Sequence, residues 1–461
     1  MFGQRRGAKR IGVIGRARGA LDALQSPATA PDPTEPDATA GVAEMLGQIG
    51  ATLLAASQAT SDVEETLYRL AARYGRSDLR VFVLPTLVLI EDSGAGPSQT
   101  AFFPAAQDAL RLDQAGAVEE LVRRAFDART DPEVVIAGVA KIRTAEPRFG
   151  PFLSVVGYML LTVGFGLVLN PTLTALPVYV VLGVIVGVIV FVGARLPTLS
   201  LILPVATAFA VTLLISLLVR PLVHDDVLRL VAPSLVSFLP GLTLTIAAVE
   251  LTSGQMMAGA SRLVYGIARL GLLAFGVFAG ISVGGQPPPA SGAATQLGSW
   301  APWVGILLVA IGYYFFSATP HRSFLWILYA LVVAYSAQLL GNVLVGAELS
   351  GLVGAIIVIP AVSLAGKLKG SPSPAIMLTC AYWLLVPGAM GFIGLSEAAA
   401  GTSGAADAIM RTFASLIAIA IGMVLGAGLS RDVTAVSRGW KAGPDLDAPP
   451  KHGARQRTHA E

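Results

Sequence analysis

The sequence predicts a mainly α-helical membrane protein, with ten transmembrane helices arranged as two five-helix inverted repeats after a small α+β domain. The first supporting observation is composition. Of 461 residues, 54% are hydrophobic and 13% are charged, whereas soluble domains carry about 25% charged residues. The charges are also unevenly placed, with 36 in residues 1–149, 15 in 150–430 and 10 in 431–461. A long, nearly uncharged middle between charged ends is typical of a membrane domain and argues against an ordinary soluble enzyme.

The second observation is a series of apolar stretches, each close to the roughly 20 residues that a spanning helix needs. Ten can be placed between Pro, Gly and charged residues. They are 152–169, 176–193, 199–219, 229–249, 262–283, 301–317, 323–344, 349–366, 374–395 and 408–429.

The third observation is a repeated Pro-Gly pair. Pro240-Gly241 lies in the fourth stretch and Pro387-Gly388 in the ninth, 147 residues later. The same offset carries the first five stretches onto the last five to within a few residues. Because five is odd, the two halves would cross the bilayer in opposite senses, which is the inverted-repeat plan of many secondary transporters. The alternative is a chance coincidence of two Pro-Gly pairs.

These patterns divide the chain into six parts. We expect a disordered basic arm and Pro-rich linker (1–40), a cytoplasmic α+β domain (41–148), membrane half one (149–283), an extracytoplasmic linker (284–300), membrane half two (301–430) and a disordered cytoplasmic tail (431–461). In the α+β domain we expect helices over 42–60, 61–74, 114–128 and 132–145, and strands within 79–90 and 98–103. Ser61 and Glu64 fit a capping box for the second helix.

The residues that usually carry enzyme chemistry are scarce. Cys380 is the only cysteine, and the four histidines do not form a metal-ligand pattern. The sequence has no Gly-rich phosphate-binding loop and no nucleophile motif. We therefore expect no enzyme activity, no metal, no cofactor and no nucleic-acid partner.

The Pro-Gly pairs are the first candidate site. Proline removes a backbone donor and glycine loosens the chain, so each pair would free backbone groups near mid-membrane. Such groups are tolerated there only when they are buried in protein or line a cavity. Pro240, Gly241, Pro387 and Gly388 are therefore predicted to form broken helices whose ends bind a substrate or an ion. The alternative is a simple kink in each helix.

Ionisable and polar residues in the apolar stretches are the second candidate site. Glu250 could pair with either Arg262 or Arg269, and Glu250 with Arg269 is the most plausible pair near a transport path, because charges at such depth are costly. Arg262 is seven residues before Arg269 on the same helical face. Snorkelling to the membrane surface is the alternative for Glu250 and for Arg262, and it is the simpler interpretation for Arg262. Polar contacts are predicted from four further residues, Thr243, Thr245, Gln338 and Asn342, although helix packing uses the same residue types.

The basic residues predict an orientation. Both termini are expected in the cytoplasm, because ten spans return the chain to its starting side and the long basic segments prefer that side. The uncharged segment 284–300 would then lie outside.

The segment Leu239–Gly254, followed by Ala258–Arg262, resembles the signature of the bacterial threonine/serine exporter family. The stretch Asp62–Thr86 resembles that family's cytoplasmic domain, and the second half, with Val386-Pro-Gly388, resembles its smaller C-terminal module. Glu250 stands where the family usually has Asp, which keeps the charge but lengthens the side chain.

The resemblance implies a secondary exporter of small amino acids, threonine and serine, in the bacterial plasma membrane. It implies coupling to the proton-motive force, as in a proton antiporter. The expected partners are the amino acid, protons and membrane lipid, with a homo-oligomer as a further option. Two alternatives stay open, namely export of dicarboxylates such as succinate, and a membrane signalling or structural role.

Overall fold

The computed structural model describes 40–92, 99–106, 109–128, 130–193, 202–219, 227–285, 296–320, 322–368, 370–372, 374–385, 392, 396, 410–411, 414–415 and 417–430. The chain divides into two units, Met1–Gly41 and Val42–Glu461, and every contact below lies within the second. Residues 1–39 of the predicted arm and linker lie outside the described residues. The predicted tail is wholly outside them.

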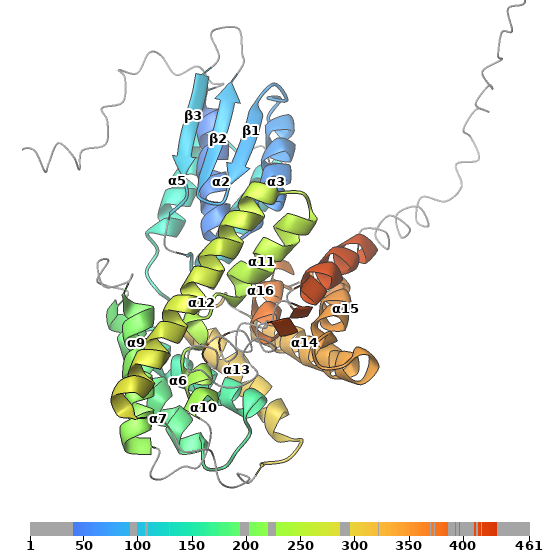
Figure 1. The fold of residues 1–461 in the computed structure, drawn as a ribbon. Coiled ribbons are helices and arrows are strands. Elements are labelled where there is room, and N and C mark those ends of the chain that lie inside the picture. Colours follow the sequence, from blue (N-terminus) through green and yellow to red (C-terminus); the bar gives the residue numbers. More distant parts are fainter. Residues whose placement is uncertain are drawn as a thin grey trace, which may run out of the picture. The chain divides into compact units, whose positions relative to one another are not determined.

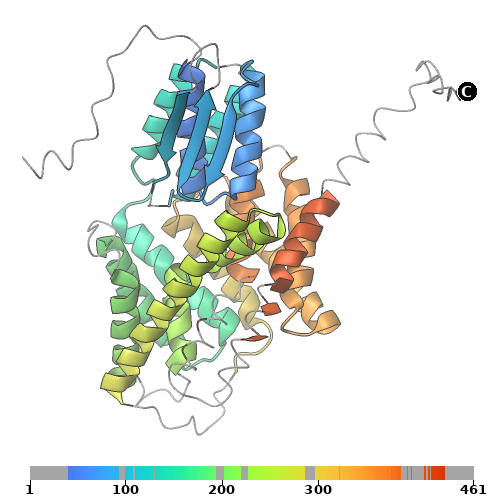
Figure 2. The same ribbon diagram turned by 45° about the horizontal axis from the view of Figure 1, so that its top comes forward.

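Residues 40–145 form the α+β region, with four helices and one sheet. The helices are α2 (Ala40–Ala55), α3 (Thr60–Arg73), α4 (Leu112–Ala128) and α5 (Pro132–Arg143), and the strands are β1 (Arg80–Leu84), β2 (Leu87–Asp92) and β3 (Gln99–Pro104). Figure 2 shows the strands side by side in front of the helices. Asp131 caps α5 by accepting a hydrogen bond from the Glu133 amide, 3.0 Å away.

The sheet is antiparallel in the order β1-β2-β3. The strand-forming run 79–90, predicted as one segment, is two strands joined at Pro85-Thr86, because proline cannot donate to a ladder and favours a turn. Side chains alternate across the sheet, so Val81, Val88 and Ile90 are buried in one hydrophobic core with α2–α5.

The rest of the described chain is helical (Figure 1). Its elements are α6 (Pro151–Leu169), α7 (Leu176–Gly193), α9 (Leu203–Leu214) with η1 (Ile215–Val219), α10 (Val227–Ser234), η2 (Val236–Phe238), α11 (Gly241–Thr252), α12 (Met256–Gly284), α13 (Ala301–Phe316), α14 (Phe324–Val345), α15 (Ser350–Ala365) and α16 (Pro374–Leu385). A further apolar helix covers Ile417–Ser430.

Four of these helices, α6, α7, α12 and α14, are long and apolar enough to cross a membrane, and the bent pair α10–α11 would make a fifth. The other five predicted spans coincide with shorter apolar helices, namely Leu203–Val219, Ala301–Phe316, Ser350–Ala365, Ile376–Leu385 and Ile417–Ser430. A mainly helical fold with four or five candidate membrane spans and a small sheet is therefore confirmed. Ten full spans in an inverted repeat remain a prediction.

Glycines bring α6 and α13 into backbone contact. A Cβ on Gly157 would lie 2.9 Å from the carbonyl oxygen of Gly312, and one on Gly164 would lie 2.7 Å from that of Gly305. Because residue numbers rise along one helix as they fall along the other, the two helices cross in antiparallel directions. Small residues at such crossings let apolar helices gain packing where the surroundings are equally apolar.

A second glycine pattern occurs twice. On α12, added Cβ atoms at Gly276 and Gly280 would lie 2.6 Å from the Val205 oxygen and 2.9 Å from the Phe209 oxygen of α9. On the helix Ile417–Ser430, added Cβ atoms at Gly422 and Gly426 would meet the carbonyl oxygens of Leu352 and Ala355 on α15 in the same way, the second at 3.0 Å. The two glycines of each pair have G-x-x-x-G spacing, which lets the backbones of two helices approach closely.

Candidate functional site

The fourth predicted span is broken at the Pro-Gly pair. Helix α10 ends at Ser234, a single 3₁₀ turn follows, and α11 starts at Gly241, with a 68° bend between the two parts. Pro240 has no amide hydrogen to continue the first helix. Its carbonyl instead accepts the hydrogen bond from the Leu244 amide, at 2.9 Å, that opens α11. The break is thus a helix start, and its first amides have no partner within the helix.

Tyr158 of α6 satisfies the backbone that the break releases. Its hydroxyl donates to the Ser234 carbonyl at 2.8 Å and lies 2.9 Å from the Ser237 hydroxyl. Because a phenol has one proton, the Ser237 hydroxyl donates in the second contact. Tyr158 and Ser234 are fully buried, so the hydrogen bond between them stabilises the bend out of contact with water, whereas Ser237 is half-buried.

Replacing Tyr158 with phenylalanine is therefore expected to lower the free energy of unfolding by about 1–3 kcal/mol, since the buried Ser234 carbonyl and the half-buried Ser237 hydroxyl lose their partner. Thermal unfolding of the purified protein in detergent measures this effect. A suitable control is Tyr329→Phe, because the Tyr329 hydroxyl is exposed and makes one long hydrogen bond, 3.4 Å, to the Ala361 carbonyl. An unchanged melting temperature for Tyr158→Phe would contradict this role.

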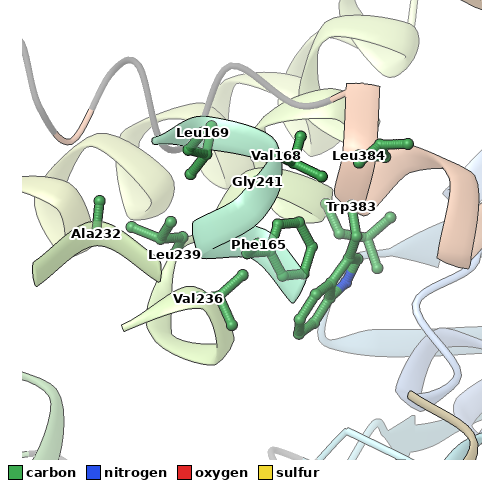
Figure 3. A pocket seen from close by; sticks show the side chains of 10 residues that line it. Phe165, Val168, Leu169, Ala232, Val236, Leu239, Gly241, Trp383 and Leu384 are labelled. Carbon is green, nitrogen blue, oxygen red and sulfur yellow. The ribbon is translucent and has the colours of Figure 1, made fainter. Parts of the chain in front are cut away.

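A cavity of about 50 Å³ lies against the start of α11 (Figure 3). Its lining side chains are apolar apart from the indole N–H of Trp383, and its walls come from α6, the two sides of the break and α16. The lining residues are Phe165, Val168, Leu169, Ala232, Val236, Leu239, Gly241, Leu242, Trp383 and Leu384. Helix α16 ends at Leu385, two residues before Pro387. Pro387 and Gly388 themselves lie outside the described residues.

The other predicted polar residues do not line this cavity. Thr245 is buried, and its hydroxyl has no hydrogen-bond partner in the described part of the chain. Thr243 and Gln338 are half-buried, whereas Asn342 is exposed. Pro240 is buried within the break.

Glu250 takes part in a second cluster, which we call the clasp (Gln58, Thr60, Glu250 and Arg262). The Glu250 carboxylate is fully buried. One oxygen, Oε1, accepts from the Thr60 amide at 2.9 Å and from the Thr60 hydroxyl at 3.0 Å. The other oxygen, Oε2, lies 3.3 Å from Arg262 Nε, and Arg262 Nη2 donates to the Gln58 carbonyl at 3.2 Å.

The partner of Glu250 is therefore Arg262, one of the two arginines with which it could pair, and not Arg269, the partner expected nearest the transport path. The physical reason is the tight connection between α11 and α12. Gly254, with φ 84°, turns the chain back directly, so Glu250 near the end of α11 faces Arg262 in the second turn of α12. Arg269 is half-buried almost two turns further on, with no ion pair among the described residues.

Sequence reasoning missed Thr60 and Gln58. The capping box at Ser61–Glu64 is wrong, because α3 begins at Thr60 after Ala59, which offers no side-chain cap. The Glu250 carboxylate caps α3 instead, at a helix terminus whose dipole favours a negative charge. The sequence carries no signal of this external cap, because Ser61 and Glu64 offer a local capping box in its place.

The clasp can bind donors and acceptors at once, since a buried carboxylate and a buried guanidinium stand side by side. Charge-assisted hydrogen bonds of this kind are about twice as strong as neutral ones. In the described part of the chain, no three His, Cys, Asp or Glu side chains come together to hold a metal.

Comparison with known proteins supplies a family. The family model described as "Putative threonine/serine exporter" matches residues 44–284, which include the α+β region, the broken helix and the clasp. No curated protein and no solved structure matches. The match covers more than half of the chain and agrees with the resemblance seen at Leu239–Arg262. The chain belongs to the threonine/serine exporter family.

Proposed function

We propose that this protein is a secondary active exporter of small amino acids, threonine and serine, in the plasma membrane of a bacterium. The observation that carries the proposal is the break at Pro240-Gly241, where a helix start meets a cavity between apolar helices. Membership of an exporter family and the apolar helices support transport as the general activity.

The break has the chemistry that a small amino acid needs. The amides that open α11 have no partners within the helix, and the helix dipole favours an anion there, so they would receive the substrate carboxylate. Phe165 and Trp383 line the cavity and would pack against the side chain. Helix α11 also contacts α16, whose sequence continues into Pro387-Gly388, so the second pair would complete the site.

Repeated glycine contacts support the inverted repeat. Gly157 corresponds to Gly305 and Gly164 to Gly312, each at an offset of 148, and the contacts exchange these partners. Such reciprocal contacts are what a two-fold axis between two related halves produces. The seating of α12 on α9 recurs as the seating of 417–430 on α15, at offsets of 146 and 147. We therefore place the two halves in opposite senses, with both termini in the cytoplasm.

Proton coupling is assigned to Glu250. A carboxylate can take up and release a proton, whereas Arg262 stays charged at accessible pH. Protonation of Glu250 would weaken its attraction to Arg262 and to the N-terminus of α3. In this way proton uptake would loosen contacts on the cytoplasmic side of the transporter. Glu250→Gln should then abolish the pH dependence of efflux, and Glu250→Asp should retain it.

Dicarboxylate export is the second candidate. The observation that favours it is Arg269, a half-buried cation on α12 for which the described residues offer no counter-charge. A dicarboxylate would need a second positive group of this kind in addition to the start of α11.

The decisive experiment uses purified full-length protein in liposomes loaded with radiolabelled threonine, serine or succinate. We expect threonine and serine to leave protein-containing vesicles several-fold faster than empty ones, and faster still with a proton gradient in the antiport direction. Glu250→Gln provides the matched variant, since it removes the charge and keeps the size. Release of succinate alone would favour the second candidate, and no release of any solute would overturn the exporter proposal.

A further inference from the structure

Thr60 presents an unusual pair of donors to Glu250. Its amide and its hydroxyl both point at the same carboxylate oxygen, at 2.9 and 3.0 Å. An amino nitrogen and a β-hydroxyl held by one carbon skeleton are also the donors of free threonine and serine. The clasp therefore already holds the donor set of the expected substrate, supplied by the chain itself.

Arg262 binds a matching acceptor, which is a backbone carbonyl. Its Nη2 binds the Gln58 carbonyl oxygen at 3.2 Å, while its Nε lies 3.3 Å from Glu250. The guanidinium is therefore aimed both at the carboxylate and at an oxygen brought by the α2–α3 loop. A free α-carboxylate would be a stronger acceptor at this position, because it is charged and can engage a guanidinium through two oxygens.

Two polar atoms of the clasp form no hydrogen bond with the residues that occupy it. Glu250 Oε2 and Arg262 Nε are buried and complete no hydrogen bond in the described part of the chain, although they form an ion pair. The Glu250 side chain is fully buried and that of Arg262 is 12% exposed, so water does little to satisfy these atoms. A neutral peptide is thus an incomplete ligand for two charged groups, whereas the ammonium and carboxylate of a free amino acid would match both.

We infer that Glu250 and Arg262 form a loading site for a β-hydroxy-α-amino acid, and that Gln58–Thr60 occupy it here as a tethered substitute. The inference rests on the proposed function and names the step before the substrate reaches the broken helix. Glu250 is nine residues beyond Gly241 on α11, about 13 Å of helix rise. The ammonium and hydroxyl of the substrate bind Glu250, its carboxylate binds Arg262, and the α2–α3 loop must leave first.

The first test measures equilibrium binding of radiolabelled threonine, serine and alanine to the full-length protein in nanodiscs. Wild type should bind threonine and serine about tenfold more tightly than alanine, because Glu250 accepts from the hydroxyl. Thr60→Val keeps the shape of the first side chain of α3 but removes its hydroxyl. It should raise threonine affinity about fivefold or more, because the tethered competitor is weakened. Glu250→Gln should lose the preference for threonine over alanine.

The second test does not depend on the fold surviving a change at Thr60. A cysteine introduced by Ala59→Cys is labelled with a thiol reagent, and Cys380, the only native cysteine, is buried. Threonine should speed the labelling several-fold and alanine should not, because the substrate displaces the loop. Val134→Cys, on the exposed face of α5, is the control and should label at one rate throughout.

The outcomes separate the two proposals. If vesicles export threonine but Thr60→Val binds it no more tightly and labelling of residue 59 is unchanged, the loading site is wrong while the exporter stands. If none of the amino acids binds and none is exported, both proposals fall.

Discussion

Replacing Arg262 with leucine is expected to lower the free energy of unfolding by about 3–5 kcal/mol, because it leaves the fully buried Glu250 carboxylate without a counter-charge. The change also removes the donor to the Gln58 carbonyl, so the α2–α3 loop loses an attachment as well. Few single substitutions reach this size, and leaving a buried charge without a partner is one of the mechanisms that does.

Two matched variants make the expectation specific, with thermal unfolding in detergent as the measurement. Arg269→Leu removes an arginine seven residues further along α12, where the described residues form no ion pair, and should cost under about 1 kcal/mol. The double variant Arg262→Leu with Glu250→Gln should recover much of the loss, because the amide oxygen still accepts from Thr60 and no charge is left buried. If Arg262→Leu and Arg269→Leu melt alike, the clasp does not stabilise the protein.

Gly312→Val is expected to abolish recovery of folded protein. A Cβ at this position would lie 2.6 Å from the Leu161 nitrogen and 2.7 Å from the Gly157 oxygen, and both atoms belong to the backbone of α6. Backbone in a packed helix pair cannot move aside as a flexible side chain can, so α13 would have to separate from α6. Size-exclusion chromatography of the solubilised protein should show aggregate in place of a single peak.

The control is Gly271→Val on α12, where an added Cβ would meet no atom within 4 Å. It should give a normal peak. Gly164→Val should fail as Gly312→Val does, because Gly164 is its counterpart at the offset of 148 and makes the equivalent contact. A normal profile for Gly312→Val would mean that α6 and α13 do not approach as described.

Local chemistry explains what could be predicted from the sequence. Pro240 lacks an amide hydrogen, so the broken helix follows from the residue itself. The helix α5 was predictable from Asp131 and Pro132, which act on their own neighbours. The turn at Pro85 is a local effect too, although the continuous run of strand formers on both sides of it hid the hairpin.

The clasp could not be predicted in the same way. Ser61 and Glu64 satisfy the pattern of a capping box as well as a true one would, and nothing nearby indicates that α3 starts one residue earlier. Glu250 could reach Arg262 or Arg269 by helical spacing, and the outcome depended on the turn at Gly254. Its contact with Thr60 joins residues 190 positions apart, for which a single sequence carries no signal.

The same separation has a consequence for synthesis. Ribosomes add about 5–20 residues per second, so the carboxylate that caps α3 is made about 10–40 s after the helix it caps. Until then α3 of the nascent α+β region has no cap and cannot form its contact with Glu250. The α+β region can therefore reach its final structure only after α11 has been synthesised. A ribosome stalled before residue 250 would leave this region more open to protease than the finished chain.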